Sequence, residues 1–247
     1  MIDTGSDIPV WSTAPSSLEL PANAIHIWRA SFDIEPDTLS RLRETLAPDE
    51  KARASRFAFP RDRDHFTAGR GVLRDLLSRY LGQPPAAAVF EYGPRAKPAL
   101  RSVHSGLPLR FNLSHSHGLA LYAFTYGREV GIDLELIRTD FGGDALAQRY
   151  FSKREVAELL ALPPGLRPMS FFVCWTQKEA FVKALGEGLQ IPLDSFDVPL
   201  MPRGRGTLRS PDGRRWSLLS FRPAERFVAA VAGEGVGTEI GYWQWTP

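Results

Sequence analysis

Two acidic residues alternate with apolar ones in Val130–Leu136 of this 247-residue chain. Asp133 and Glu135 occupy every second position, so a period of two predicts a β-strand with both carboxylates on one face. Same-face neighbours on a strand lie about 6.5 to 7 Å apart, and their charges repel unless a cation is near. Oxygen-only ligands suit Mg²⁺ or Mn²⁺. We also expect Gly131 to leave this face open to a bulky ligand.

A third acid follows about forty residues later in a stretch with helical spacing. Residues 171–185 place apolar side chains on one face, and Thr176, Glu179 and Lys183 form an adjacent polar stripe. Two plainer interpretations remain open at this point. In the first, Asp133 and Glu135 are ordinary solvated side chains of a strand. In the second, Glu179 and Lys183 form a surface pair that contributes about 0.2 to 0.5 kcal/mol.

Three motifs in order carry a resemblance to a known family. They are Asn112-Leu113-Ser114-His115-Ser116, then Gly131-Ile132-Asp133-Leu134-Glu135, then Trp175 with Lys178-Glu179-Ala180. The set resembles the 4'-phosphopantetheinyl transferases, and more narrowly the surfactin-synthetase-activating type with W and KEA in its third motif. The resemblance covers about residues 48 to 198.

The resemblance implies a fold and a reaction. The fold is α+β, with two similar α+β halves related by a pseudo-twofold axis and the active site in the cleft between them. We expect an N-terminal half at residues 1–126, which contacts the coenzyme A phosphates, and a C-terminal half at 127–247 with the metal site and the carrier-protein contacts. The reaction is Mg²⁺-dependent transfer of 4'-phosphopantetheine from coenzyme A to a serine of an acyl or peptidyl carrier protein, releasing 3',5'-ADP.

Roles for individual side chains follow from the same resemblance. Asp133, Glu135 and Glu179 are the implied metal ligands, and Asp133, Glu179 and Lys183 are the implied catalytic residues, with Glu179 or a metal-bound water accepting the serine proton. The implied coenzyme contacts are Arg53, Arg70, Lys97, Ser114, His115 and Lys183. The loop around Lys97 has Ala96 where the family usually has glycine.

Charge is distributed unevenly and leaves two rival functions open. Residues 51–110 hold 12 basic and 4 acidic side chains, which favours an anionic ligand. A nucleic-acid-binding module would use this block, but no recognised motif supports it. A non-catalytic coenzyme A or nucleotide-binding protein would keep Arg53, Lys97 and His115, yet would not need three aligned acids. We therefore expect no nucleic-acid partner.

Composition favours a soluble, cytoplasmic protein. The chain is 43% hydrophobic and has no run of about 18 apolar residues, so we expect neither a membrane partner nor export. Its single cysteine, Cys174, lies in an apolar helix and favours a packing role. The family type with fused halves implies a monomer.

Periodicity also predicts the elements that must position these residues. We expect strands at 24–33, 109–113, 119–125, 216–222, 226–232 and 239–245, and helices at 37–46, about 62–81, and 169–185. Ser152-Lys153-Arg154-Glu155 predicts a capping box that opens a further helix. We expect Glu155 to act in that cap and His26 to be a packed strand residue.

Overall fold

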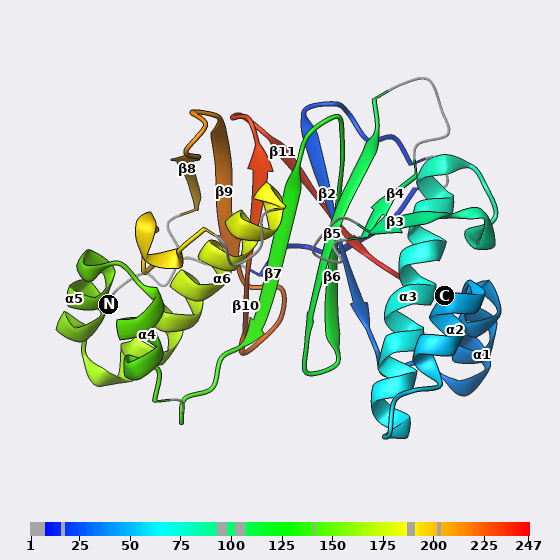
Figure 1. The fold of residues 1–247 in the computed structure, drawn as a ribbon, viewed down its shortest axis with the longest axis horizontal. Helices are drawn as coiled ribbons and strands as arrows, with labels where there is room; N and C mark the ends of the chain where they lie inside the picture. The colour runs from blue at the N-terminus through cyan, green and yellow to red at the C-terminus, as the bar shows by residue number, and fades with distance from the viewer. Residues whose placement is uncertain are drawn as a thin grey trace.

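Two sheets lie back to back in the middle of the molecule, and helices cover both outer faces (Figure 1). The computed structural model describes residues 8–15, 18–92, 98–101, 107–140, 142–186, 191–201 and 204–247. The predicted α+β class with two similar halves is confirmed.

The first sheet has five strands in the order β1-β11-β2-β6-β5. Their bounds are β1 Ser12–Thr13, β11 Glu239–Gln244, β2 Ala24–Ser31, β6 Leu119–Tyr126 and β5 Leu109–Ser116. β5, β6 and β2 pair antiparallel, whereas β11 pairs parallel with both β2 and β1. The last strand of the chain therefore belongs to the sheet of the N-terminal half, and a division at residue 126 does not separate the strands completely.

The second sheet has four strands in the order β7-β10-β9-β8, all antiparallel. Their bounds are β7 Val130–Leu136, β10 Phe227–Glu234, β9 Arg215–Phe221 and β8 Arg205–Arg209. A separate two-stranded ribbon pairs β3 Phe90–Tyr92 with β4 Pro98–Leu100.

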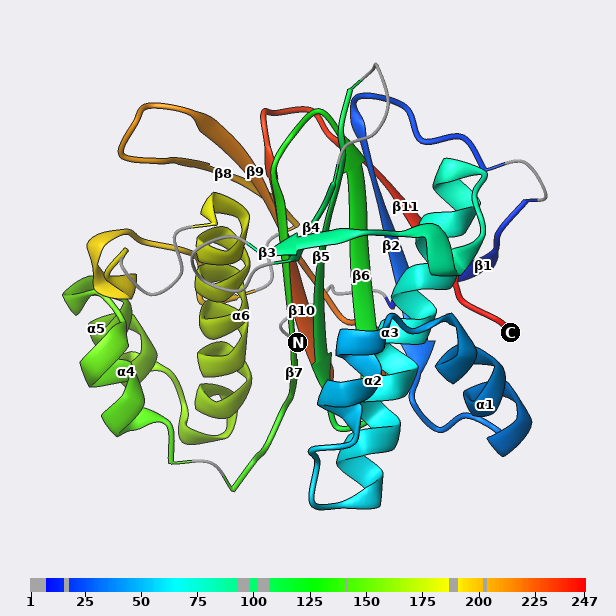
Figure 2. The ribbon, with the colours of Figure 1, turned by 45° about the vertical axis from the view of Figure 1, so that its right-hand side comes forward.

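Each sheet carries its own helical layer (Figure 2). The first sheet is covered by α1 Pro36–Thr45, α2 Pro48–Ala54 and α3 Pro60–Leu81, and the second by α4 Asp144–Tyr150, α5 Lys153–Ala161 and α6 Arg167–Leu185. α3 and α6 both end at a glycine with a left-handed backbone, Gly82 and Gly186, which is the usual helix stop. No helix among the described residues is both long and apolar enough to cross a membrane.

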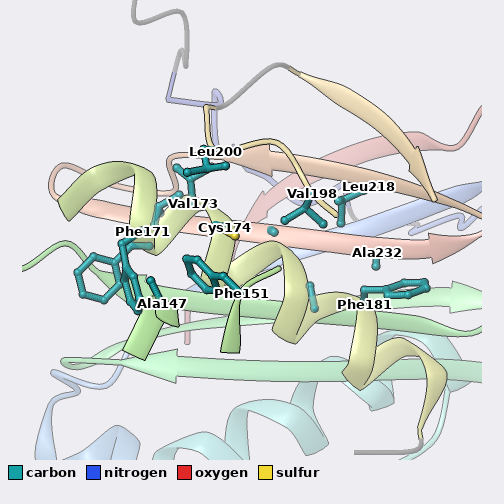
Figure 3. Packing of buried hydrophobic residues seen from close by; sticks show 14 of the residues in the cluster. Ala147, Phe151, Phe171, Val173, Cys174, Phe181, Val198, Leu200, Leu218 and Ala232 are labelled. Atoms are coloured by element: carbon teal, nitrogen blue, oxygen red, sulfur yellow. The ribbon is translucent and has the colours of Figure 1, made fainter. Parts of the chain in front are cut away.

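Three apolar clusters hold these layers together. Between the sheets lie the inward faces of β2, β6, β7, β9 and β10, including Ile27, Leu121, Ile132 and Val231. α3 packs on the outer face of the first sheet and α6 on that of the second. Figure 3 shows the cluster around α6, with the buried Cys174 among aromatic and aliphatic side chains. The packing role predicted for Cys174 is confirmed, and burial raises the pKa of its thiol.

The other packing predictions also hold. His26 in β2 is 5% exposed, contacts the Tyr80 hydroxyl through Nδ1 at 3.0 Å, and has its pKa lowered to about 4 by burial. Ser152 and Glu155 form the predicted capping box at the start of α5. These residues therefore belong to the scaffold.

Candidate active site

β5 and β7 form the seam where the two sheets meet. Asn112 Oδ1 of β5 accepts a hydrogen bond from Ile132 N at 2.9 Å, and Ser116 Oγ accepts one from Leu136 N at 3.3 Å. Because the later residue of β5 contacts the later residue of β7, the two strands run in the same direction. Side chains, rather than a backbone ladder, thus join the N-terminal half to the acidic strand.

Asp133 lies at the centre of this seam and is only 4% exposed. Its Oδ1 accepts hydrogen bonds from Lys183 Nζ at 2.6 Å and from Ser114 Oγ at 3.0 Å. Lys183 Nζ also lies 3.3 Å from Ser114 Oγ and 3.4 Å from the Ile132 carbonyl oxygen. One residue from each of β5, β7 and α6 therefore meets at a single point.

Gly131 has a different role from the one that the sequence suggested. A Cβ atom at this position would lie 2.1 Å from the Ala180 carbonyl oxygen and 2.3 Å from the Ala184 nitrogen. The space beside Gly131 is therefore filled by the backbone of α6, and the expectation that a ligand approaches there is wrong. The glycine instead lets α6 lie close on β7, which brings Glu179 and Lys183 to the acidic face.

Glu135 and Glu179 both stand in the field of Asp133. Burial and then the Asp133 charge raise the pKa of Glu135, while a hydrogen bond from Ser116 and the charge of Lys183 oppose the rise. The same two causes raise the pKa of Glu179, and the charge of Lys183 opposes the rise. Ser116 Oγ lies 3.4 Å from Glu135 Oε2. All three acids thus share one electrostatic environment with Lys183 as a nearby cation.

The metal assignment of these acids stays a prediction. Within the described ranges, no three His, Cys, Asp or Glu side chains come together in an arrangement that could hold a metal ion. The chemistry of the group nevertheless fits a hard cation, because Asp133 Oδ2 is buried without a hydrogen-bond partner and carboxylates are the ligands that Mg²⁺ takes.

His115 lies beside the same cluster at the surface. Its ring stands 5.6 Å from that of Phe32, measured between centroids. Partial loss of solvent, followed by the charges of His65 and Lys183, lowers the pKa of His115. The lowered pKa favours the neutral imidazole, which keeps one N–H donor.

Arg53 lines an open hollow between α2 and α3. Its guanidinium carbon lies 5.2 Å from the centre of the Phe66 ring, and Arg56 and Phe57 line the same hollow. Arg70 is mostly buried, with Nε 3.9 Å from Glu50 Oε1 and the guanidinium carbon 5.6 Å from the centre of the Phe90 ring. Lys97 lies outside the described residues.

Two buried ion pairs in matching places were missed from the sequence. In the C-terminal half, Lys178 of α6 is fully buried and lies 2.8 Å from Glu155 Oε2, and it also donates to the Leu193 carbonyl at 2.6 Å. In the N-terminal half, Arg74 of α3 lies 2.7 Å from Glu50 Oε2.

Both glutamates occupy the third position of a short helix and cap its start. The available signal was this shared position before a long helix with a basic residue. The buried pair with Glu155 makes Lys178 of the KEA motif a structural residue. The next residue of the motif, Glu179, lies instead in the field of Asp133 and Lys183.

Comparisons with known proteins find two family models that match consecutive parts of the chain. A family model described as 4'-phosphopantetheinyl transferase superfamily matches residues 129–232, and one described as 4'-phosphopantetheinyl transferase, N-terminal, matches residues 27–125.

Two curated relatives are similar over most of their length. The 4'-phosphopantetheinyl transferase HetI of Nostoc sp. is 41% identical over 95% of this chain and 98% of its own. The 4'-phosphopantetheinyl transferase Sfp of Bacillus subtilis is 32% identical over 70% of this chain and 74% of its own. The chain therefore belongs to the 4'-phosphopantetheinyl transferase superfamily.

Proposed function

We propose that this protein transfers the 4'-phosphopantetheine group of coenzyme A to a serine hydroxyl of an acyl or peptidyl carrier protein and releases 3',5'-ADP. One observation carries the proposal. Asp133, Ser114 and Lys183 come from three separate elements and meet within hydrogen-bonding distance, with Glu135 and Glu179 in the same field. A protein that only bound a nucleotide would not need two further acids in the field of Asp133.

Phosphoryl transfer depends on positioning and on the stabilisation of charge. The ammonium of Lys183 and the hydroxyl of Ser114 are donors that suit the pyrophosphate oxygens, and His115 supplies one further N–H beside them. Because Ser114 and His115 lie on β5 and Lys183 lies on α6, both halves of the molecule contribute to binding the diphosphate.

Asp133, Glu135 and Glu179 would hold Mg²⁺ or Mn²⁺ in the working enzyme. The buried, unpartnered Asp133 Oδ2 and the raised pKa values of the two glutamates support this assignment. When bound, the metal would supply positive charge against the charge that develops on the leaving 3',5'-ADP.

Glu179 is the proposed acceptor of the serine proton. Its carboxylate is partly withdrawn from water beside Asp133, and these two causes raise its pKa above the usual value. A higher pKa makes a carboxylate a stronger base while it remains ionised at neutral pH. The role rests on this environment and on the family resemblance.

The hollow beside Arg53 suits the 3'-phosphate of the coenzyme. Arg53 and Arg56 present two guanidinium groups there, and Phe57 and Phe66 supply aromatic surface. A guanidinium can hold a phosphate through two parallel hydrogen bonds.

Arg70 and Lys97 remain proposed coenzyme contacts, and the division at residue 126, the monomeric state and the cytoplasmic location remain predictions.

Mass spectrometry of an apo carrier protein tests the proposal. After incubation with coenzyme A and Mg²⁺, we expect the carrier to gain one phosphopantetheine arm, and we expect Asp133→Asn and Glu179→Gln to slow the gain by at least about 100-fold. Asp194→Asn is the matched control, because Asp194 is an exposed acid of the same half. An unmodified carrier with folded wild-type protein would refute the proposal.

A further inference from the structure

Lys183 places its ammonium among three oxygen atoms, one of which belongs to the proposed metal ligand Asp133. Its ammonium nitrogen is surrounded by Asp133 Oδ1, Ser114 Oγ and the Ile132 carbonyl oxygen, at 2.6, 3.3 and 3.4 Å. Three oxygen atoms of different chemical types around one positive centre form the kind of ligand set that hard cations occupy. The pair is well sheltered, with the Asp133 side chain 6% exposed and that of Lys183 31% exposed.

The contact makes Lys183 the counter-ion of Asp133, with the ammonium nitrogen 2.6 Å from Oδ1. A divalent cation entering the group would meet that charge at close range, and two cations sharing one carboxylate repel each other strongly where water is partly excluded.

We propose that Lys183 is the resting counter-ion of Asp133 and competes with the divalent metal for this carboxylate until the pyrophosphate of the coenzyme draws the ammonium away. This inference rests on the proposed function. Lys183 has the side chain for such an exchange, because an ammonium on a flexible four-carbon stem can change partners without a fixed geometry. It also lies in the last turn of α6, just before the left-handed Gly186.

The exchange makes metal and coenzyme cooperative. Free protein holds the metal weakly because the Lys183 ammonium on Asp133 Oδ1 repels a cation at Oδ2 of the same carboxylate, whereas coenzyme-bound protein holds it tightly. Coupling between two ligands is reciprocal, so the metal must strengthen coenzyme binding by the same factor. The ammonium would thus delay metal capture until the substrate pyrophosphate is present.

Titration with Mn²⁺ alone, followed by electron paramagnetic resonance, measures the competition directly. We expect Lys183→Met, which removes the charge and keeps the length of the side chain, to bind Mn²⁺ about tenfold more tightly than wild type, or more. Lys153→Met is the control for net charge, because Lys153 is exposed on α5 and makes no ion pair among the described residues. It should leave Mn²⁺ affinity unchanged.

Repeating both titrations with saturating coenzyme A closes a thermodynamic cycle. In wild type the coenzyme should strengthen Mn²⁺ binding, and in Lys183→Met that enhancement should shrink. Unchanged or weaker Mn²⁺ binding by Lys183→Met would overturn the inference. Circular dichroism checks the fold, and Lys183→Gln, which also removes the charge, replaces the first variant if that one is unfolded.

The outcome also separates this inference from the proposed function. If wild type modifies the carrier and binds Mn²⁺, yet Lys183→Met binds Mn²⁺ no better, only the competition is refuted. If wild type with coenzyme A neither binds Mn²⁺ nor modifies the carrier, the proposed function fails first.

Discussion

Glu135 and Glu179 lie in the electrostatic field of Asp133, and the cost appears as a raised pKa of each glutamate. Burial is the largest cause of the raised pKa of Glu179, followed by the charge of Asp133. A carboxyl whose pKa is higher in the folded than in the unfolded state binds its proton more tightly when folded. Its stabilising contribution is complete below the unfolded pKa and is lost as the pH rises through the folded one.

Glu179→Gln should therefore stabilise the metal-free protein at neutral pH. In the presence of a chelator, we expect wild type to lose stability relative to Glu179→Gln as the pH rises from about 4, the usual glutamate range, through the raised pKa. Thermal melts of both proteins across that pH range measure the difference. A difference of constant size would show that the pKa of Glu179 is not raised.

The buried pair of Lys178 and Glu155 gives a second test at the level of single residues. Both side chains are almost fully buried, so Lys178→Met leaves an uncompensated charge on Glu155. We expect the free energy of unfolding to fall by about 3 to 5 kcal/mol, measured by urea denaturation. Arg154→Met, which breaks an exposed pair with Glu158 on the same helix, should have little effect. Equal effects from both variants would contradict the structural role of Lys178.

At the level of elements, the contact between α6 and β7 decides whether the site exists. β7 supplies Asp133 and Glu135, α6 supplies Glu179 and Lys183, and Gly131 sets how closely the two elements approach. Because the atoms that face Gly131 belong to the helix backbone, they cannot move aside by a simple change of rotamer.

Gly131→Ala should consequently weaken both the fold and the reaction. We expect a loss of about 1 to 3 kcal/mol or more from overpacking, together with slower transfer, because α6 must move away from Asp133. Gly165→Ala is the matched control, since a Cβ atom at Gly165 meets nothing within 4 Å. Urea denaturation and the carrier assay measure the two effects, and wild-type behaviour of Gly131→Ala would contradict the close packing.

Both elements of this contact were predictable from the sequence, but two features were not. Alternation in Val130–Leu136 and helical spacing in residues 171–185 predicted both elements. The role of Gly131 could not be predicted, because a glycine in a strand allows the close approach of either a ligand or a neighbouring helix. The Lys178 pair was also hidden, since a lysine in an apolar helix gives no sign of its partner until Glu155 is placed beside it.

At the level of the whole molecule, the two halves depend on each other through β11. The C-terminal strand pairs with β2, and Trp245 just beyond it is 5% exposed in the core beneath α3. Its Nε1 donates to Asp75 Oδ2 of α3 at 2.8 Å. The end of the chain therefore completes the half in which the chain begins, a crossing that no local pattern in the sequence indicated.

Trp245→Ala should destabilise the N-terminal half although it lies near residue 247. We expect a loss of about 3 to 5 kcal/mol, and hydrogen exchange should show the loss of protection in β2 and α3. Val236→Ala, at an exposed position before β11, is the control. Loss of protection confined to α6 and β9 would contradict the crossed arrangement.

The central claim is that three carboxylates from two elements serve one divalent ion beside a diphosphate. A crystal grown with coenzyme A and Mn²⁺, measured at the manganese absorption edge, tests it most directly. We predict one anomalous peak ligated by Asp133, Glu135 and Glu179, with Lys183 moved from Asp133 to the pyrophosphate. A peak held by other residues, or a bound coenzyme with Glu179 directed away from the metal, would contradict the claim.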